Sequence, residues 1–372
     1  MTTDDLMLPR SLLPSDGRFG SGPSKIRDEA VAALAGVAHG YLGTSHRRDG
    51  VRSVVAGIRS GLGDLYSLPD GYEVLIGVGG STLFWDAASF GLVEHRSTHL
   101  VLGEFSSKFA QVARAAPHLA EPQVCETAPG DTPIRPETVE GDVYAYPHNE
   151  TSTGVIVDVH RPRGDALVVV DGTSAAGGMR VDPRAFDVYY FAPQKCFASE
   201  GGLWLALCSP AALARIERIN GTRWMPATLD LSIAVENSRL DQTYNTPSLA
   251  TLFLLRQQLE WMLDNGGLEF AAGRCDRSAA IVYGWADGHK YATPFVKDTS
   301  HRSPVTATID FDEPVDASAL ASALRANGIV DVEPYRKLGR NQLRIALFPA
   351  IEPDDVATLT RAIDFLLERM AG

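Results

Sequence analysis

The sequence predicts an α/β protein: a large domain built on a mostly parallel sheet covered by helices, followed by a smaller α+β domain. Between residues 73 and 219, short runs rich in β-branched and aromatic residues alternate with helical stretches, which is typical of a parallel sheet. After about residue 265 the order changes to strand, helix, strand and closing helix. The chain has 372 residues, of which 45% are hydrophobic, so it can fill one large core or two ordinary ones.

The expected elements follow from the hydrophobic pattern and from the turn residues between them. We expect an N-terminal arm at residues 1–15, a large domain at 16–265 and a small C-terminal domain at 266–372. Strands are expected at residues 73–76, 99–102, 143–146, 166–170, 188–191, 203–208, 305–311 and 342–348. Helices are expected at residues 26–39, 49–63, 82–92, 106–116, 210–219, 246–265, 317–326 and 353–369. The helix at 246–265 begins with a hydroxyl cap, Thr246, and has Pro247 in its first turn.

Composition and charge narrow the classes of partner. The net charge of −12 argues against nucleic acid or an anionic membrane, so the basic clusters at residues 46–48 and 336–344 stand out. The four cysteines are widely spaced and lack a C-x-x-C pair, which is typical of reduced thiols in the cytoplasm. The sequence shows no signal-peptide pattern, no apolar run of membrane length and no H-E-x-x-H metal motif. We therefore expect a cytoplasmic protein that needs no metal.

The stretch at residues 187–202 contains a candidate for covalent chemistry. Residues 188–191 are typical of a buried strand, and Gln194 and Lys195 follow its end directly. Lysine is rarely buried, and a lysine held in apolar surroundings loses its proton at modest cost and can act as an amine nucleophile. Such a lysine can form a Schiff base. For Lys195 taken alone, a surface lysine just past a strand end is the alternative.

Asp171 gives Lys195 a possible partner. It ends the apolar run Ala-Leu-Val-Val-Val, where a carboxylate must cap a turn or meet a cation. The two residues follow neighbouring strands of the expected parallel sheet, so both would lie in the crevice beyond the carboxyl ends of those strands. A carboxylate facing a lysine-bound ring is what pyridoxal 5'-phosphate requires, because the acid keeps the pyridine nitrogen protonated. A turn-capping role is the alternative for Asp171 alone.

A glycine-rich loop at residues 77–82 is a candidate phosphate site. Glycines let the backbone approach a phosphate, and the amides of the following helix attract the anion. The loop lacks the third glycine of G-x-G-x-x-G, where Thr82 stands, and has no G-K-[ST]. It therefore fits a lone phosphate better than a dinucleotide, with Ser81 and Thr82 as hydroxyl donors. A plain tight turn between strand and helix is the alternative.

Eight motifs together resemble the phosphoserine aminotransferases of high-GC Gram-positive bacteria, across essentially the whole chain. Each motif alone is weak, but the set is highly specific. The motifs are GRFGSGPSK (17–25), GTSHR (43–47), GGST (79–82), GEFSSKF (103–109), HNETSTG (148–154), FAPQK (191–195), TYNTP (243–247) and YRKLGRNQLR (335–344). The resemblance implies the class-V aminotransferase family, fold type I, a pyridoxal-phosphate-binding large domain and a homodimer with shared active sites.

The resemblance also implies a role for each matching residue. Lys195 would carry the cofactor as a Schiff base, and Asp171 would pair with the ring nitrogen. Phe105 would stack on the ring, and Thr151 would bond near the ring oxygen. The cofactor phosphate would be held by Ser81, Thr82 and Gln194, and from the other subunit by Asn245 and Thr246.

For substrates, the resemblance implies amino-group exchange between glutamate or 2-oxoglutarate and 3-phosphohydroxypyruvate or O-phospho-L-serine, in serine biosynthesis. Arg344 would grip the α-carboxylate in a bidentate fashion. The distal phosphate or carboxylate would be surrounded by His46, Arg47 and Arg336. A solvated charge cluster is the alternative for these basic residues, and use of a phosphorylated keto acid of vitamin B6 synthesis stays open.

The chain departs from enterobacterial members at several positions. They carry histidine at Tyr335, arginine at Thr82 and tryptophan at Phe105, so the phosphate clamp has fewer obvious contacts here, and Lys337 or Arg340 is a candidate to compensate. Three other functions are open: an aminotransferase for small neutral keto acids, a cysteine-desulfurase-like lyase and a non-catalytic binding module. The lyase would need a reactive cysteine on a mobile loop.

Overall fold

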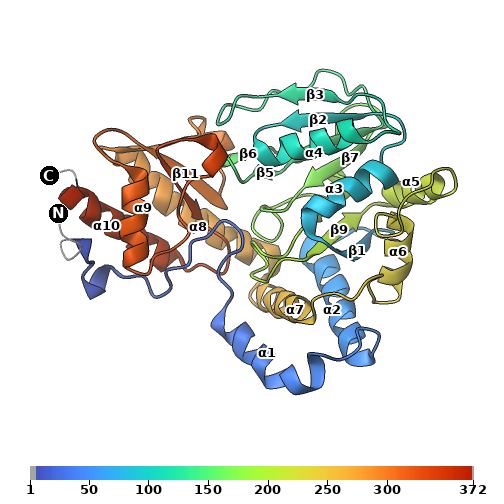
Figure 1. The fold of residues 1–372 in the computed structure, drawn as a ribbon, viewed down its shortest axis with the longest axis horizontal. Coiled ribbons are helices and arrows are strands. Elements are labelled where there is room, and N and C mark those ends of the chain that lie inside the picture. The colour runs from blue at the N-terminus through green and yellow to red at the C-terminus, as the bar shows by residue number, and fades with distance from the viewer. Residues whose placement is uncertain (1–5, 371–372) are drawn as a thin grey trace.

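Within residues 6–370, which this computed structural model describes, the apolar runs of the N-terminal two thirds form one seven-stranded sheet (Figure 1). Its order is β1-β9-β8-β7-β4-β2-β3, and β9 alone runs antiparallel to its neighbours among these strands. The strands are β1 (Glu73–Val78), β2 (Ser97–Val101), β3 (Gln123–Glu126), β4 (Val143–Pro147), β7 (Leu167–Asp171), β8 (Val188–Phe191) and β9 (Leu203–Cys208). The predicted mostly parallel sheet is confirmed.

Helices cover both faces of this sheet because its strands are apolar on both sides. One face packs on α2 (Asp49–Tyr66) and α7 (Leu249–Asp264), with α1 (Asp28–Tyr41) lying along α7. The other face packs on α3 (Gly80–Gly91), α4 (Glu104–Ala115), α5 (Pro210–Asn220) and α6 (Leu231–Arg239). Successive residues of β8 separate the two layers: Tyr189 belongs to the α2 and α7 side, and Tyr190 to the α3 and α4 side.

The C-terminal part has its own apolar core around an antiparallel three-stranded sheet (Figure 1). Its strands are β10 (Ala292–Pro294), β11 (Thr306–Phe311) and β12 (Gln342–Ala346), and its helices are α8 (Gly267–Gly288), α9 (Ala317–Ala326) and α10 (Pro353–Met370). A short hairpin of β5 (Asn149–Glu150) and β6 (Val155–Ile156) follows β4. The described residues also include the 3₁₀ segments η2 (Arg10–Leu12), η3 (Pro183–Ala185), η4 (Thr299–His301) and η5 (Arg336–Leu338). The domain boundary near residue 265 stays a prediction.

The N-terminal stretch runs along the C-terminal part (Figure 1). Residues 1–5 of the predicted arm lie outside the described residues. From residue 6 onward the stretch is attached to the small core, since the backbone N–H of Leu8 donates to Asn327 Oδ1 at 2.8 Å and the N–H of Ser15 donates to Asp355 Oδ1 at 2.6 Å. In residues 6–370 we find no helix that combines the length and the hydropathy needed to cross a membrane.

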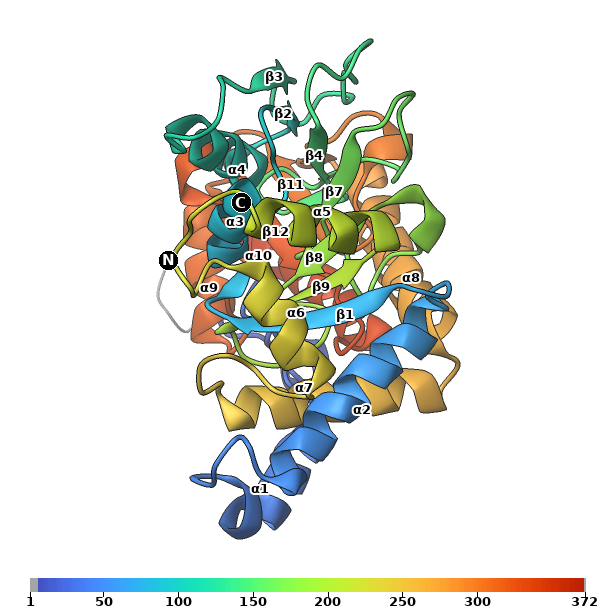
Figure 2. The same ribbon diagram turned by 90° about the vertical axis from the view of Figure 1, so that its right-hand side faces the viewer.

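Several elements differ from those expected. The helix predicted from Thr246 begins at Leu249, because Ser248 is the residue whose side chain accepts from the backbone N–H of Thr251. The prediction missed β3, the hairpin of β5 and β6, α6, β10 and most of α8. Of these, α6 begins at a capping residue, Asp230, whose side chain accepts from the N–H of Ser232. Among the missed elements, only the hairpin lies between β4 and β8 in the chain, and it leaves the pairing of β4, β7 and β8, on which the predicted site depends, unbroken. Figure 2 shows that central run from the side, with α5 and α6 in front of the sheet.

Candidate active site

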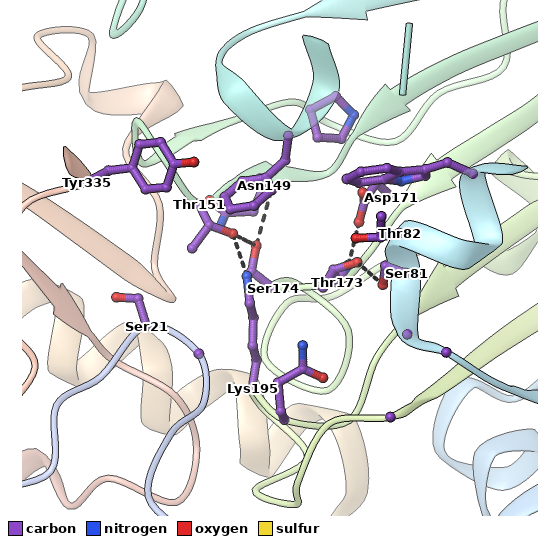
Figure 3. Close-up of a pocket in the computed structure, with 18 of the residues that line it drawn as sticks. Ser21, Ser81, Thr82, Asn149, Thr151, Asp171, Thr173, Ser174, Lys195 and Tyr335 are labelled. Atoms are coloured by element: carbon purple, nitrogen blue, oxygen red, sulfur yellow. Dashed lines mark hydrogen bonds between the residues drawn. The ribbon is translucent and has the colours of Figure 1, made fainter. Parts of the chain in front are cut away.

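A cavity of about 420 Å³ lies at the carboxyl ends of β4, β7 and β8 (Figure 3). Ligands of α/β proteins bind at this edge of the sheet. Seven of the residues predicted for cofactor and catalysis line it: Ser81, Thr82, Phe105, Thr151, Asp171, Gln194 and Lys195. Arg344, predicted for the substrate carboxylate, lines it too. The cavity therefore joins residues that are up to 323 positions apart, from Ser21 to Arg344.

Lys195 points into the cavity and is only 7% exposed (Figure 3). Its Nζ donates a hydrogen bond of 2.8 Å to Thr151 Oγ1, which donates in turn to Ser174 Oγ at 2.8 Å. Gly22 lies against the lysine stem, where a Cβ would come within 2.8 Å of Lys195 Cε. Burial lowers the pKa of Lys195 from 10.5 to about 8, against the opposing charge of Asp171. A neutral amine, the form that acts as a nucleophile, is therefore accessible near neutral pH.

Asp171 reaches the same cavity from the neighbouring strand. β7 and β8 are parallel, with Asp171 opposite Tyr190 in register, so the carboxyl ends of the two strands lie at one edge of the sheet. Asp171 Oδ1 accepts from the Thr173 N–H at 2.8 Å, and Oδ2 accepts from Tyr190 Oη at 3.0 Å. Burial raises the pKa of Asp171, while these hydrogen bonds and the charge of Lys195 act to lower it. The structure brings the predicted pair together, and their catalytic roles stay a prediction.

The glycine-rich loop after β1 forms a cradle for an anion. Gly79 and Gly80 have φ values of 113° and 73°, which favour glycine, and no side chain caps the start of α3. The amides of this first turn therefore face outward as donors. A Cβ at Gly80 would meet nothing within 4 Å, so the space beside it is open. Ser81 Oγ lies 2.7 Å from Thr173 Oγ1, and Gln194 Oε1 is buried without a partner in the described residues.

Phe105 forms another wall of the cavity, and a buried carboxylate fixes its position. Its ring centroid lies 5.4 Å from Lys195 Nζ. Glu150, which is 0% exposed, accepts from the backbone N–H groups of Phe105 and Ser106 at 3.3 and 2.9 Å. Glu150 also accepts from Ser106 Oγ and Ser152 Oγ, each at 2.7 Å. A carboxylate at a helix N-terminus is favourable, so Glu150 anchors the start of α4 and with it the aromatic wall.

Arg344 brings a positive charge into the cavity from β12. Its Nη1 donates to the carbonyl oxygen of Thr151 at 3.4 Å, and the Tyr335 ring centroid lies 5.5 Å from the guanidinium carbon. Its Nε is buried and has no hydrogen-bond partner in the described residues. Burial lowers the pKa of Arg344, and the group stays cationic because arginine does not deprotonate in proteins. A buried cation with a free donor is what a carboxylate ligand needs.

The remaining predicted site residues do not line this cavity of a single chain, and their roles stay predictions. Arg47 is exposed and donates to Gln242 Oε1, and Arg336 is exposed in η5. His46 is partly exposed on the loop before α2. Asn245 and Thr246 are exposed on the loop before α7, where the prediction placed a contact to a second subunit. Because the hydrogen bond joins Arg47 to Gln242, the loops at residues 43–48 and 242–246 share one surface.

The two basic residues proposed to compensate for Thr82 are already paired. Lys337 Nζ binds the Glu104 carboxylate, and Arg340 binds Asp310 with a shortest contact of 2.5 Å. Neither residue lines the cavity. Their compensating role stays a prediction, and acidic neighbours that the sequence did not place nearby pair with both charges in this structure.

The chain is similar in sequence to known proteins. The model of the aminotransferase class-V family matches residues 92–331, which is more than half of the chain. The chain belongs to the class-V aminotransferase family. It is 55% identical over 370 residues to a phosphoserine aminotransferase of Corynebacterium glutamicum, covering 98% of each chain. It is 54% identical over 371 residues to that of Rhodococcus jostii, covering 99% of this chain and 100% of the other.

A solved structure shows the same fold. The phosphoserine aminotransferase of Cytophaga hutchinsonii matches with a TM-score of 0.84 at 24% identity, over 94% of this chain and 99% of that chain. Fold type I is thereby confirmed as the architecture of this class-V aminotransferase. The predicted family is confirmed as well.

The cavity of this class-V aminotransferase fits pyridoxal phosphate, the cofactor of the family. A buried amine, a carboxylate on the neighbouring strand and an uncapped helix start meet in one space. The unpartnered buried oxygens of Gln194 and Asn149 in the described residues mark polar groups that a ligand can satisfy. Lys195 would hold the cofactor covalently, Asp171 would face its ring nitrogen, and the start of α3 would hold its phosphate.

Sequence reasoning missed several residues that the structure brings to this site. Thr173, Ser174, Asn149 and Ser21 line the cavity but were not selected. Thr173 and Ser174 directly follow the selected Asp171-Gly172 turn, and a hydroxyl pair at that place was a usable signal. The remaining lining residues are Gly22, Gly79, Gly80, Trp85, Pro147, Gly202 and Tyr335.

Proposed function

We propose that this protein is a pyridoxal-phosphate-dependent phosphoserine aminotransferase. It exchanges the amino group between glutamate or 2-oxoglutarate and O-phospho-L-serine or 3-phosphohydroxypyruvate, a step of serine biosynthesis. The observation that carries the proposal is the buried Lys195 amine beside Asp171, in a cavity also lined by Arg344, whose buried Nε has no partner in the described residues. Relatives that are 54–55% identical over the whole chain have this activity by name.

The residues divide the reaction between them. Pyridoxal phosphate, when bound, supplies an electron-withdrawing ring that stabilises the negative charge left when the substrate α-proton is removed. Lys195 would hold the cofactor covalently, and a substrate amine would free it. Its freed Nζ would then take the proton from the substrate α-carbon and deliver it to the carbon attached to the cofactor ring. Thr151, within 2.8 Å of that Nζ, keeps the amine directed into the cavity.

Arg344 determines which end of the substrate lies deepest. Both substrates carry an α-carboxylate, and a guanidinium binds a carboxylate through two parallel hydrogen bonds. The distal group, a phosphate in one substrate and a carboxylate in the other, needs a second cationic site. We propose that Arg336, which directly follows the cavity-lining Tyr335, supplies it together with Arg47 and His46 of a second subunit, since Arg47 and His46 do not reach the cavity of their own chain.

A single-turnover spectrum tests this function. Purified protein loaded with pyridoxal phosphate is mixed with O-phospho-L-serine, and the absorbance is followed from the aldehyde form to the amine form of the cofactor. Full conversion at submillimolar phosphoserine, with little conversion by L-serine or L-alanine at the same concentration, is the expected result. Equal conversion by the neutral amino acids would refute the substrate class and favour a small-keto-acid aminotransferase.

We also propose a homodimer whose subunits complete each other's sites. Exposed apolar side chains gather on and near α1 and the loop before α7, namely Val31, Val37, Leu42, Leu240 and Tyr244. Such a patch is typical of a protein interface. It surrounds the loops that carry Arg47 and Asn245, so a second copy on this face would receive both residues. Cyclic two-fold dimers, the commonest assembly, place each such patch against its equivalent.

Mixing inactive subunits tests the shared site. Lys195→Met and Arg47→Ala are unfolded together and refolded at equal amounts. If Arg47 acts across the interface, half of the dimers are mixed and each has one intact site, so about a quarter of the wild-type activity returns. If Arg47 serves its own chain, every mixed dimer lacks a complete site and no activity returns. Light scattering on wild type gives the assembly state independently.

Two wider alternatives are addressed by the same protein preparation. A phosphorylated keto acid of vitamin B6 synthesis has the same two anionic ends, so we propose it as a second substrate to be assayed with glutamate. A cysteine-desulfurase-like activity is disfavoured because Cys196 and Cys275 are buried, and burial raises the pKa of each thiol.

We propose the cytoplasm as the location of the protein, because all four cysteines are free thiols in the described chain.

A further inference from the structure

Asp171 is the end point of a buried chain of hydrogen bonds. Trp85 Nε1 lies 2.8 Å from Tyr190 Oη, and Tyr190 Oη lies 3.0 Å from Asp171 Oδ2. Trp85 is 3% exposed and Tyr190 is fully buried. Trp85 comes from α3, Tyr190 from β8 and Asp171 from β7, so three separate elements converge on one carboxylate. Neither aromatic residue has a role in the function proposed above.

The chemistry of the groups fixes the direction of this chain. An indole N–H can only donate, so Tyr190 Oη accepts from Trp85 and its own proton is free to point elsewhere. The one other partner of that hydroxyl in the described residues is Asp171 Oδ2, which accepts as a carboxylate. The opposite oxygen, Oδ1, accepts from the backbone N–H of Thr173 at 2.8 Å. Each carboxylate oxygen therefore has one donor, which stabilises the charged form of Asp171.

Packing leaves the Tyr190 hydroxyl little freedom to turn away. Its ring stacks on Phe84 with centroids 4.5 Å apart and an interplanar angle of 26°. Phe109 meets it edge-on at 6.1 Å, and the Trp85 and Phe109 rings stack at 6.3 Å. All four rings belong to the core between the sheet and α3 and α4. A donor held this rigidly orients its acceptor as well as stabilising it.

We propose that Tyr190, supported by Trp85, is a positioning residue that keeps Asp171 ionised and directed at the ring nitrogen of the cofactor. This inference rests on the proposed function, because it assigns Asp171 to that nitrogen. With both donors in place, a charged Asp171 beside a protonated ring nitrogen would be favoured over a neutral Asp171 beside an unprotonated ring nitrogen. Without them the ring loses positive charge, and removal of the substrate α-proton becomes slower.

Three titratable groups are coupled to Asp171, and one of them, Tyr189, is coupled through charge without a hydrogen bond to the carboxylate. Tyr190 faces it from β8, and Lys195 acts on it through its charge from the segment after β8. Arg344 and Glu150 act in turn on Lys195, in opposite directions. Burial raises the pKa of Tyr190 well above 10, so the phenol stays protonated and remains a donor throughout the range of the assay. The hydroxyl that Tyr190→Phe removes is therefore a hydrogen-bond donor at every pH of the assay.

The first test uses cofactor-free protein. Aspartate carboxyl carbons are labelled with ¹³C and titrated by NMR, and Asp171→Asn assigns the resonance. Tyr190→Phe removes one donor, so the pKa of Asp171 is expected to rise by roughly one unit, a tenfold change in the proton equilibrium. Trp85→Phe should raise it less. Tyr189→Phe is the matched control, because this neighbour is as buried but its hydroxyl contacts His148 Nδ1 at 3.0 Å.

The second test uses the loaded enzyme. In Tyr190→Phe the pH midpoint of the bound cofactor's absorption is expected to move upward, because a less protonated ring makes the Schiff-base nitrogen more basic. kcat should fall about tenfold, with KM for phosphoserine changed less than twofold. Tyr189→Phe should leave the midpoint in place. A Tyr190→Phe protein that is folded, with both the Asp171 titration and the midpoint at their wild-type values, overturns the inference.

These outcomes separate the inference from the function on which it rests. If wild type binds pyridoxal phosphate but does not convert with phosphoserine, the proposed function fails, while the cofactor-free titration still decides whether Tyr190 sets the pKa of Asp171. If wild type converts normally and the two tyrosine variants behave alike in both tests, only the inference fails. Equal shifts in Tyr190→Phe and Tyr189→Phe would mean general loosening of the core, which also overturns it.

Discussion

The charge on Lys195 makes a prediction about stability that needs no cofactor. Lys195→Met keeps an unbranched side chain of similar length but removes the amine that binds Thr151 Oγ1 at 2.8 Å. In the folded protein burial lowers the pKa of Lys195 from 10.5 to about 8. A group whose pKa is lower when folded binds fewer protons in the folded state over the interval between the two values. Stability due to this lysine must therefore rise with pH across that interval.

The size of the effect follows from the two pKa values. Below pH 8 the lysine is protonated in both states and adds no pH dependence. Between 8 and 10.5 the unfolded chain holds a proton that the folded chain has released. Each pKa unit corresponds to about 1.4 kcal/mol, so the wild type should gain about 3 kcal/mol relative to Lys195→Met between pH 7 and pH 11. The sign is opposite to that of a lysine stabilised by a salt bridge.

Urea unfolding of cofactor-stripped protein, followed by circular dichroism at several pH values, measures this difference. The relevant quantity is the free energy of unfolding of wild type minus that of Lys195→Met, since titrations common to both proteins cancel. Lys297→Met, which removes an exposed lysine, provides the baseline. A difference that stays constant from pH 7 to pH 11, or that falls with pH, would refute a desolvated amine at position 195.

Three further predictions concern the walls of the site. Arg344→Lys keeps the charge but loses the bidentate fork, so KM for phosphoserine and glutamate should rise about 10- to 100-fold in steady-state assays, with cofactor binding unchanged; an unaltered KM would contradict the carboxylate site. Glu150→Gln replaces one carboxylate oxygen with an amide N–H₂ that faces at least two of these donors, so urea unfolding should show a loss of about 3 kcal/mol, and wild-type stability would contradict the anchor. Gly79→Ala places a Cβ at φ 113°, 2.9 Å from Leu83, so it should lower the free energy of unfolding by about 1–3 kcal/mol and weaken pyridoxal phosphate binding in equilibrium dialysis. Gly36→Ala, whose Cβ would meet nothing within 4 Å, should cause neither loss.

The sequence predicts the central run of strands well because burial on both faces leaves an unmistakable pattern. The strands at 188–191 and 203–208 begin and end as predicted, and β7 is shifted by one residue. Since β7 and β8 follow one another in a parallel sheet, placing Asp171 and Lys195 together needed only the rule that neighbouring strands end at one edge. That part of the site depends on local pattern and on topology alone.

The outer parts of the site could not be predicted in the same way. Lys337 and Arg340 form ion pairs with Glu104 and Asp310 outside the cavity lining, and those acids come close only after β11, β12 and α4 have packed. Arg47 lies on a surface that one chain leaves exposed, so no reasoning within that chain places it in the cavity. Tyr190 was missed for a different reason: in a buried strand, a tyrosine looks like core, and its hydroxyl partner lies on another strand.

The turn from Asp171 to Ser174 explains why these separate motifs form one site. Asp171 accepts from the Thr173 N–H, and the Thr173 hydroxyl lies 2.7 Å from Ser81 Oγ, so the acid is tied to the phosphate cradle. Ser174 accepts from Thr151 Oγ1, which accepts from Lys195 Nζ, so the same turn is tied to the amine. Four consecutive residues thus fix the spacing between the three groups that would hold one cofactor. A change in this turn should therefore alter ring, phosphate and lysine contacts together, whereas a change at Arg344 should affect the substrate alone.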